Sequence, residues 1–295
     1  MSGVPIPKDL PLPLPAPEPI LIGVLVFFFL MHIVFVNFMV GGSLLTLYYE
    51  IKGLKNKAYD KLAYTLASTI TVNKSIAVVL GVGPLLAINT LYTVYFYSAN
   101  ALTGDFWIAV IPLVIIAFLL TYVHKYLWHA MEKVKWLHIA VSALAGGLFL
   151  FIPLIFLANI NLMLFPDKWT AVQGFWDALM NVGNAFPRYF HFITACFALT
   201  GLFMVWMFRR MDDNEIREIG FERADLIRKG YRWAFWPTLL QFFIGPVVIL
   251  TLPEVSQPIG KVYGIIGFGA LTGMFMLFLM GIELRRPAGC IGRSF

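Results

Sequence analysis

The stretch Met31-His32-Ile33-Val34-Phe35-Val36-Asn37-Phe38-Met39-Val40-Gly41-Gly42 lies inside a long apolar run that extends from Ile20 to Tyr49. Glu50 and Lys52 close this run. The run is longer than the ~20 residues that an α-helix needs to cross a bilayer. A histidine in such a run is costly unless it has a partner. His32 is therefore the first candidate for a functional residue.

The composition of the whole chain indicates an integral membrane protein. Of its 295 residues, 60% are hydrophobic and only 13% are charged, and the mean hydropathy is +0.80. Soluble domains carry about 25% charged residues. The apolar runs are long and do not alternate, and in lipid each segment must satisfy its own backbone polar groups. We therefore expect an all-α helical membrane bundle.

Seven segments are long and apolar enough for us to expect seven transmembrane helices. Their approximate bounds are 20–50, 73–98, 106–124, 137–160, 187–208, 232–252 and 260–283. The first, third and fifth connections and the C-terminal tail are basic, whereas the other connections hold one lysine or none. Basic connections favour the cytoplasmic side, so we expect the N-terminus outside and the C-terminus in the cytoplasm. The net charge of +6 thus reflects topology and indicates no nucleic-acid partner.

We divide the chain into a Pro-rich extended arm at 1–19, a transmembrane domain at 20–286 and a cytoplasmic tail at 287–295. No cleavable signal peptide is evident. The second segment is ambiguous, because its apolar residues begin at Leu62 but are interrupted at Lys74. We expect residues 62–72 to lie along the inner interface, with Lys74 snorkelling to the headgroups. The alternative draws Lys74 into the membrane.

A second histidine, His191, matches His32 in depth. Counting about 20 residues outward from the charged inner ends at Glu50 and Arg209 places both histidines just inside the outer surface. Arg188 precedes His191 by three positions, so the two share a helix face. We expect His32 and His191 to ligate haem iron and Arg188 to bind a haem propionate. The alternative is that each histidine is hydrogen-bonded to a neighbouring helix.

The other histidines, His124, His129 and His138, fall at the inner interface beside lysines. We interpret them as interfacial residues of a basic loop, and the alternative is that they hold an inner haem. The two cysteines form no CxxCH motif, so any haem is held non-covalently. No Asp or Glu lies in the central part of any segment, and the chain therefore shows no acidic proton relay for reducing oxygen.

These motifs resemble the large subunit of cytochrome bd quinol oxidases. The stretch 31–42 is similar to the family's first helix, an aromatic-rich run that begins at a haem-ligating histidine and ends in glycine. The segment 157–191 resembles the end of the family's fourth helix, its outer loop and its fifth helix. The resemblance implies that His32 is a haem ligand, that His191 is the axial ligand of a low-spin b haem, and that Arg188 is a basic residue near that haem.

The chain also departs from this family. His138 falls on a family histidine that ligates no haem, and Ile265 replaces an axial methionine. The glutamates of the second and third helices, the long quinol-binding loop, the Gly-Arg-Gln-Pro-Trp motif and the later helices have no counterpart. The resemblance therefore implies a shortened relative of this subunit, without a complete oxygen-reducing centre in this chain alone.

The sequence favours a b-type cytochrome subunit of a prokaryotic cytoplasmic membrane. We expect it to hold one or two b haems and to relay electrons between the quinone pool and an outer-face partner, such as a periplasmic c-type cytochrome or an oxidoreductase. Tyr92, Tyr95, Phe96, Tyr97 and Trp107 could line a quinone site, although interface anchoring explains them equally well. The alternatives are a bd-type oxidase subunit whose missing ligands come from another chain, and a haem-free anchor of a respiratory complex.

Overall fold

The computed structural model describes residue 6, residues 13–253 and residues 261–285, apart from the side chains of residues 71–74, 261, 262 and 265. Most of the N-terminal arm and the whole C-terminal tail that the sequence predicts therefore lie outside the described residues, as do the side chains of Lys74 and Ile265. The described part consists of helices and short connections, without a strand. Its α-helices are α1 Glu18–Gly53, α2 Lys57–Leu91, α3 Thr93–Thr103, α4 Asp105–Tyr126, α5 Lys135–Leu164, α6 Phe175–Asn181, α7 Ala185–Arg210, α8 Asp213–Ile219, α9 Arg223–Leu250 and α10 Lys261–Arg285, and its two 3₁₀ turns are η1 Glu132–Val134 and η2 Pro166–Ala171.

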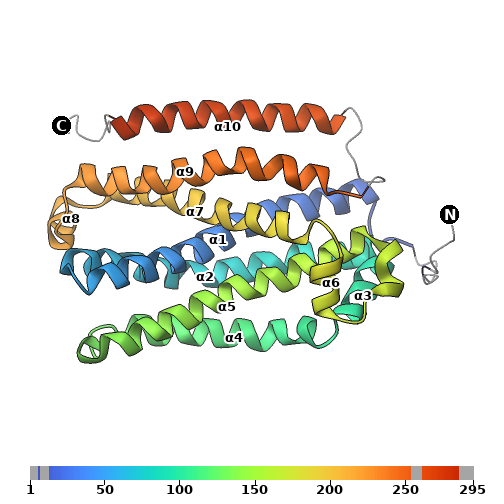
Figure 1. Cartoon of the computed structure of the whole chain (residues 1–295), viewed down its shortest axis with the longest axis horizontal. Coiled ribbons are helices and arrows are strands. Elements are labelled where there is room, and N and C mark those ends of the chain that lie inside the picture. Colours follow the sequence, from blue (N-terminus) through green and yellow to red (C-terminus); the bar gives the residue numbers. More distant parts are fainter. Residues whose placement is uncertain (1–5, 7–12, 254–260, 286–295) are drawn as a thin grey trace.

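The predicted fold class is confirmed: the chain is an all-α membrane bundle. Six helices in the described part, α1, α4, α5, α7, α9 and α10, contain stretches long and apolar enough to cross a bilayer. A seventh span is present if the two arms of α2, which meet at a bend of 43°, count as one. The long helices run side by side, with α10, α9 and α7 on one flank, α4 and α5 on the other, and α1 and α2 between them (Figure 1).

The second segment differs from the sequence prediction. The helix begins at Lys57 and ends at Leu91, and residues 93–98 belong to the separate helix α3. Leu62, Leu66 and Ile70 are almost fully buried in the main core cluster. Residues 62–70 thus pack against the neighbouring helices as the first arm of α2. A stripe of apolar residues four positions apart explains this, because it gives the first arm of α2 one continuous face to bury.

Two glycines allow neighbouring helices to approach at the level of their backbones. A Cβ atom on Gly41 of α1 would overlap the carbonyl oxygen of Cys196 on α7. A Cβ atom on Gly201 of α7 would overlap the backbone nitrogen of Ala234 on α9, and it would lie 2.6 Å from the carbonyl oxygen of Gly230. Small residues at helix crossings permit such backbone contact, which supplies the packing that holds membrane helices together. These two crossings join α1, α7 and α9 into one layer.

We predict that Gly201→Ala separates α7 from α9 and destabilises the protein by about 1–3 kcal/mol, the usual range for overpacking. The matched control is Gly147→Ala on α5, where a Cβ atom would meet nothing within 4 Å. Thermal unfolding of both purified variants in detergent measures the difference. Equal stability of the two variants would contradict the close crossing of α7 and α9.

The two ends of the bundle differ in charge. The α1–α2 link, the α4–α5 link and the segment around α8 all lie at one end (Figure 1). The lysines and arginines at this end include Lys52, Lys55, Lys57, Lys61, Lys125, Lys133, Arg209, Arg210 and Arg217. The opposite end holds α3, η2 and α6, which contain Lys168 as their one basic residue. The basic end is the cytoplasmic end if the positive-inside rule holds.

The orientation is testable with reporter fusions. We predict that green fluorescent protein fused after Phe295 fluoresces, whereas alkaline phosphatase fused there is inactive, because the phosphatase needs an extracytoplasmic location to form its disulfides. Alkaline phosphatase inserted beside Lys168 should be active. The reverse pattern of activities would show that the bundle is inserted the other way round.

Candidate functional site

His32 lies between α1 and α2. Its Nδ1 atom is 2.7 Å from the carbonyl oxygen of Ala77. A carbonyl can only accept, so Nδ1 carries the proton, and Nε2 of the neutral ring keeps a free lone pair. The ring packs against Gly81, where a Cβ atom would lie 2.8 Å from the ring carbon Cε1. Glycine at this position of α2 therefore permits the ring to lie as deeply as it does.

His191 and Arg188 lie together near the start of α7. This helix begins at Ala185, two residues before the predicted segment, and its N-cap Asn184 adopts a left-handed conformation with φ of 77°. The side chain of His191 is exposed on the surface of the chain, and Arg188 is half-buried. Within the described part of the chain, neither the His191 ring nor the Arg188 guanidinium has a hydrogen-bond or ion-pair partner.

The structure does not bring the rings of His32 and His191 together. Gly41 faces α7, and His32 precedes it by nine residues, or two and a half turns, so His32 faces the opposite side of α1. On α7, Cys196 faces α1, where its Sγ donates to Oδ1 of Asn37 at 3.3 Å. His191 precedes Cys196 by five residues and points away from α1. One haem held by both rings is therefore incompatible with this packing, whereas two separate haems are not.

Sequence reasoning missed a buried cluster at the basic end of the bundle. Glu50 near the end of α1 is fully buried between His124 near the end of α4 and His138 at the start of α5. Its Oε2 atom is 2.8 Å from Nε2 of His124, and its Oε1 atom contacts Nδ1 of His138. The two imidazole rings are stacked, with centroids 4.2 Å apart.

Lys135 and Asp60 extend this cluster toward the surface. The Lys135 ammonium is 3.1 Å from Oε1 of Glu50 and 2.7 Å from Oδ1 of Asp60. It also lies 4.0 Å from the ring centroid of Trp128, in a cation–π contact. Trp128 donates its indole N–H to Oδ2 of Asp60 at 3.3 Å. Residues from four helical segments and one connection thus meet in one polar network.

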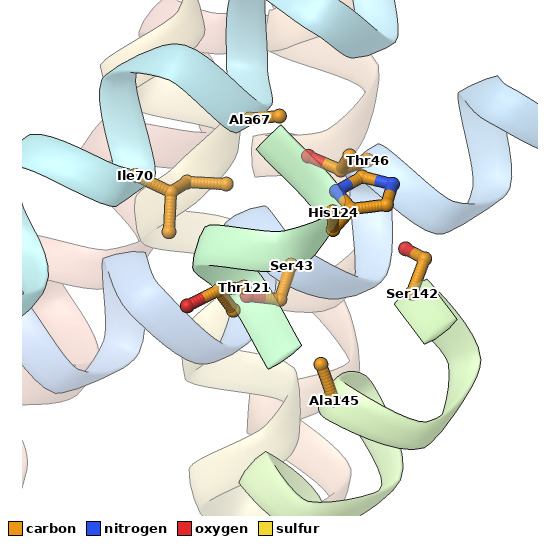
Figure 2. A pocket seen from close by; sticks show the side chains of 8 residues that line it. All are labelled: Ser43, Thr46, Ala67, Ile70, Thr121, His124, Ser142 and Ala145. Carbon is orange, nitrogen blue, oxygen red and sulfur yellow. The ribbon is translucent and has the colours of Figure 1, made fainter. Parts of the chain in front are cut away.

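A small cavity adjoins the cluster at His124. Its volume is about 20 Å³, which is enough for one water molecule. Figure 2 shows the His124 ring between the hydroxyls of Thr46 and Ser142, with Ser43 and Thr121 on the neighbouring wall. The Thr46 hydroxyl oxygen is buried and makes no hydrogen bond to another described residue. The cavity therefore offers a position for a water molecule that bonds to Thr46.

The histidines predicted at the inner interface divide into two kinds. His129 is exposed and lies against the ring of Tyr64, at a centroid distance of 5.4 Å. His124 and His138 are instead 5% and 0% exposed. One indication of this burial was present in the sequence. His124 ends a predicted segment and His138 lies at the start of the next, on the same side of the membrane as Glu50. A count of depth alone did not reveal that the three helix ends converge.

The aromatic residues considered for a quinone site lie in different surroundings. Phe96 is buried and meets the ring of Trp107 edge-on at 5.4 Å. Tyr95 packs against Trp169 of η2 at 5.9 Å. Tyr92 and Tyr97 are exposed on the outside of α3 and its N-cap. The aromatic set thus splits between a packed end of the bundle and its outer surface.

Comparison with known proteins gives no further guide to function: the chain matches no protein-family model and no curated protein.

We predict that Glu50→Ala destabilises the protein by about 3–5 kcal/mol, because it removes the buried carboxylate that contacts His124, His138 and Lys135. The control is Glu132→Ala, an exposed glutamate on η1 in the same region, which should change the stability by less than about 0.5 kcal/mol. Thermal unfolding in detergent distinguishes them. Similar unfolding temperatures would mean that the Glu50 contacts contribute nothing to stability.

Proposed function

We propose that this chain is a b-type cytochrome subunit that relays electrons between the quinone pool and a partner on the outer face of a prokaryotic cytoplasmic membrane. The observation that carries the proposal is the placement of Arg188 and His191 three positions apart on α7. Both lie on one face of an apolar helix, and neither has a partner within the described part of the chain.

Such residues are costly in a membrane unless something binds them. A haem offers a matching partner for each. Its iron accepts a lone pair from imidazole, and its propionates accept two parallel hydrogen bonds from a guanidinium. Since Arg188 is one helical turn outward from His191, the propionates would lie toward the membrane surface, where water also solvates them.

His32 supports a second haem. An iron-ligating histidine usually donates its other ring N–H to a carbonyl or carboxylate, which fixes the tautomer and increases the basicity of the ligating nitrogen. The bond from Nδ1 of His32 to Ala77 has this form and leaves Nε2 for a metal. The donor chemistry of His32, His191 and Arg188 therefore fits two haems better than one.

The bound haems would supply the one-electron redox couple, and the protein would hold and orient them. His191 is exposed on the chain, so its haem would lie at the boundary with lipid or with another subunit of the complex. This placement near the outer end suits electron exchange with a c-type cytochrome or another periplasmic oxidoreductase. The sequence resemblance to the cytochrome bd large subunit is consistent with this proposal.

We predict that the purified protein shows the reduced absorption spectrum of a b-type cytochrome, and that His191→Ala removes one haem. Arg188→Gln should keep the haem but change its midpoint potential, because a cation near the propionates is lost. The matched control is His129→Ala, an exposed histidine at the other end, which should keep the full haem content.

A folded His191→Ala protein with unchanged haem content would contradict the assignment of His191. A pigment-free wild-type preparation would favour the haem-free anchor. Oxygen uptake together with a chlorin-type haem spectrum would favour a bd-type oxidase subunit.

A further inference from the structure

We propose that Glu50, His124 and His138 form a binding site for a divalent transition-metal ion, with Zn²⁺ as the reference ligand. The site lies at the opposite end of the bundle from His191 and is independent of the haem proposal. It would use one carboxylate oxygen, Nε2 of His124 and Nδ1 of His138.

The positions of the ligand atoms suit one ion. The three atoms lie within 4.8 Å of one another, and all three residues are buried. Zinc binds imidazole nitrogen and carboxylate oxygen at about 2.0–2.2 Å, which separates neighbouring ligands of a tetrahedral site by about 3.4 Å. The carboxylate is closer than this to each ring, so each contact would open by roughly 1 Å or less to admit the ion.

The surrounding hydrogen bonds match those of metal ligands. Nε2 of His138 lies 2.7 Å from the carbonyl oxygen of His124 and therefore carries a proton. Nδ1 faces Glu50, and without a proton of its own it would bind an ion placed there. Lys135 donates to Oε1 of Glu50 and is held in turn by Asp60. At metal sites, groups that hydrogen-bond to the ligands in this way orient them toward the ion.

The charge of the cluster also calls for a cation. Glu50 and Asp60 contribute two negative charges, and Lys135 contributes one positive charge. A cation held between Glu50 and the two imidazoles would balance the carboxylate charge that the Lys135 ammonium does not.

The cavity beside His124 provides an independent indication. It has room for about one water molecule, and the buried Thr46 hydroxyl beside it makes no hydrogen bond to another described residue. Zinc sites with three protein ligands keep a fourth position for water. A water molecule in this cavity, on the side of His124, would give Thr46 its partner (Figure 2). Two imidazoles and a carboxylate favour zinc-like metals over calcium or magnesium, which prefer oxygen ligands.

Titration with Co²⁺ tests the proposal, because Co²⁺ accepts zinc ligand sets and absorbs visible light. The full-length protein, purified in detergent and treated with a chelator, should bind about one Co²⁺ per chain, and Zn²⁺ should displace it. His138→Gln should abolish this binding, whereas His129→Gln should keep it. Lys135→Met keeps all three ligands but removes the ammonium that holds Glu50, and it should weaken Co²⁺ binding by about 10–100-fold.

Wild-type protein that binds no Co²⁺ would overturn the proposal, as would a folded His138→Gln variant that binds Co²⁺ as the wild type does. If the variants do not fold, X-ray absorption at the zinc edge of the wild-type complex decides the question. Two imidazoles in the zinc shell support the site, and a shell without imidazole contradicts it.

Discussion

The contact between Gly41 of α1 and the backbone of α7 determines which way the other side chains of α1 face. Because the two helices touch at the level of their backbones, α1 cannot turn about its axis without a clash. His32 and Glu50 each lie nine residues from Gly41, one on either side, so both face away from α7. His32 then meets α2, and Glu50 meets α4 and α5. One close crossing thus orients the polar groups at both ends of the helix.

Much of the fold could be predicted from the sequence, because spans in a bilayer are set by length and hydropathy. The first, third, fourth and fifth segments lie within helices of the structure, and the sixth extends two residues past the end of α9 at Leu250. The second segment was misplaced because Asn73 and Lys74 interrupt its apolar residues. The helix nevertheless starts before this interruption, because burying Leu62, Leu66 and Ile70 against the neighbouring helices stabilises its first arm.

The candidate sites were predicted less completely, and the reason is geometric. Counting residues from a charged end gives the depth of a side chain but not its direction around the helix. Because the two residues lie at the same depth, the sequence suggested that His32 and His191 act together, although their rings point to different neighbours. Direction depends on which helices are adjacent, and only the folded bundle shows this. The same lack of direction hid the convergence of Glu50, His124 and His138.

The shared face of His32 and Glu50 on α1 has a mechanical consequence. The two residues are 18 positions apart, or five full turns, and therefore about 27 Å apart along the helix. Ala77 holds one of them, and two histidines hold the other. Any twist or slide of α1 would therefore strain the bonds at both ends of the helix together.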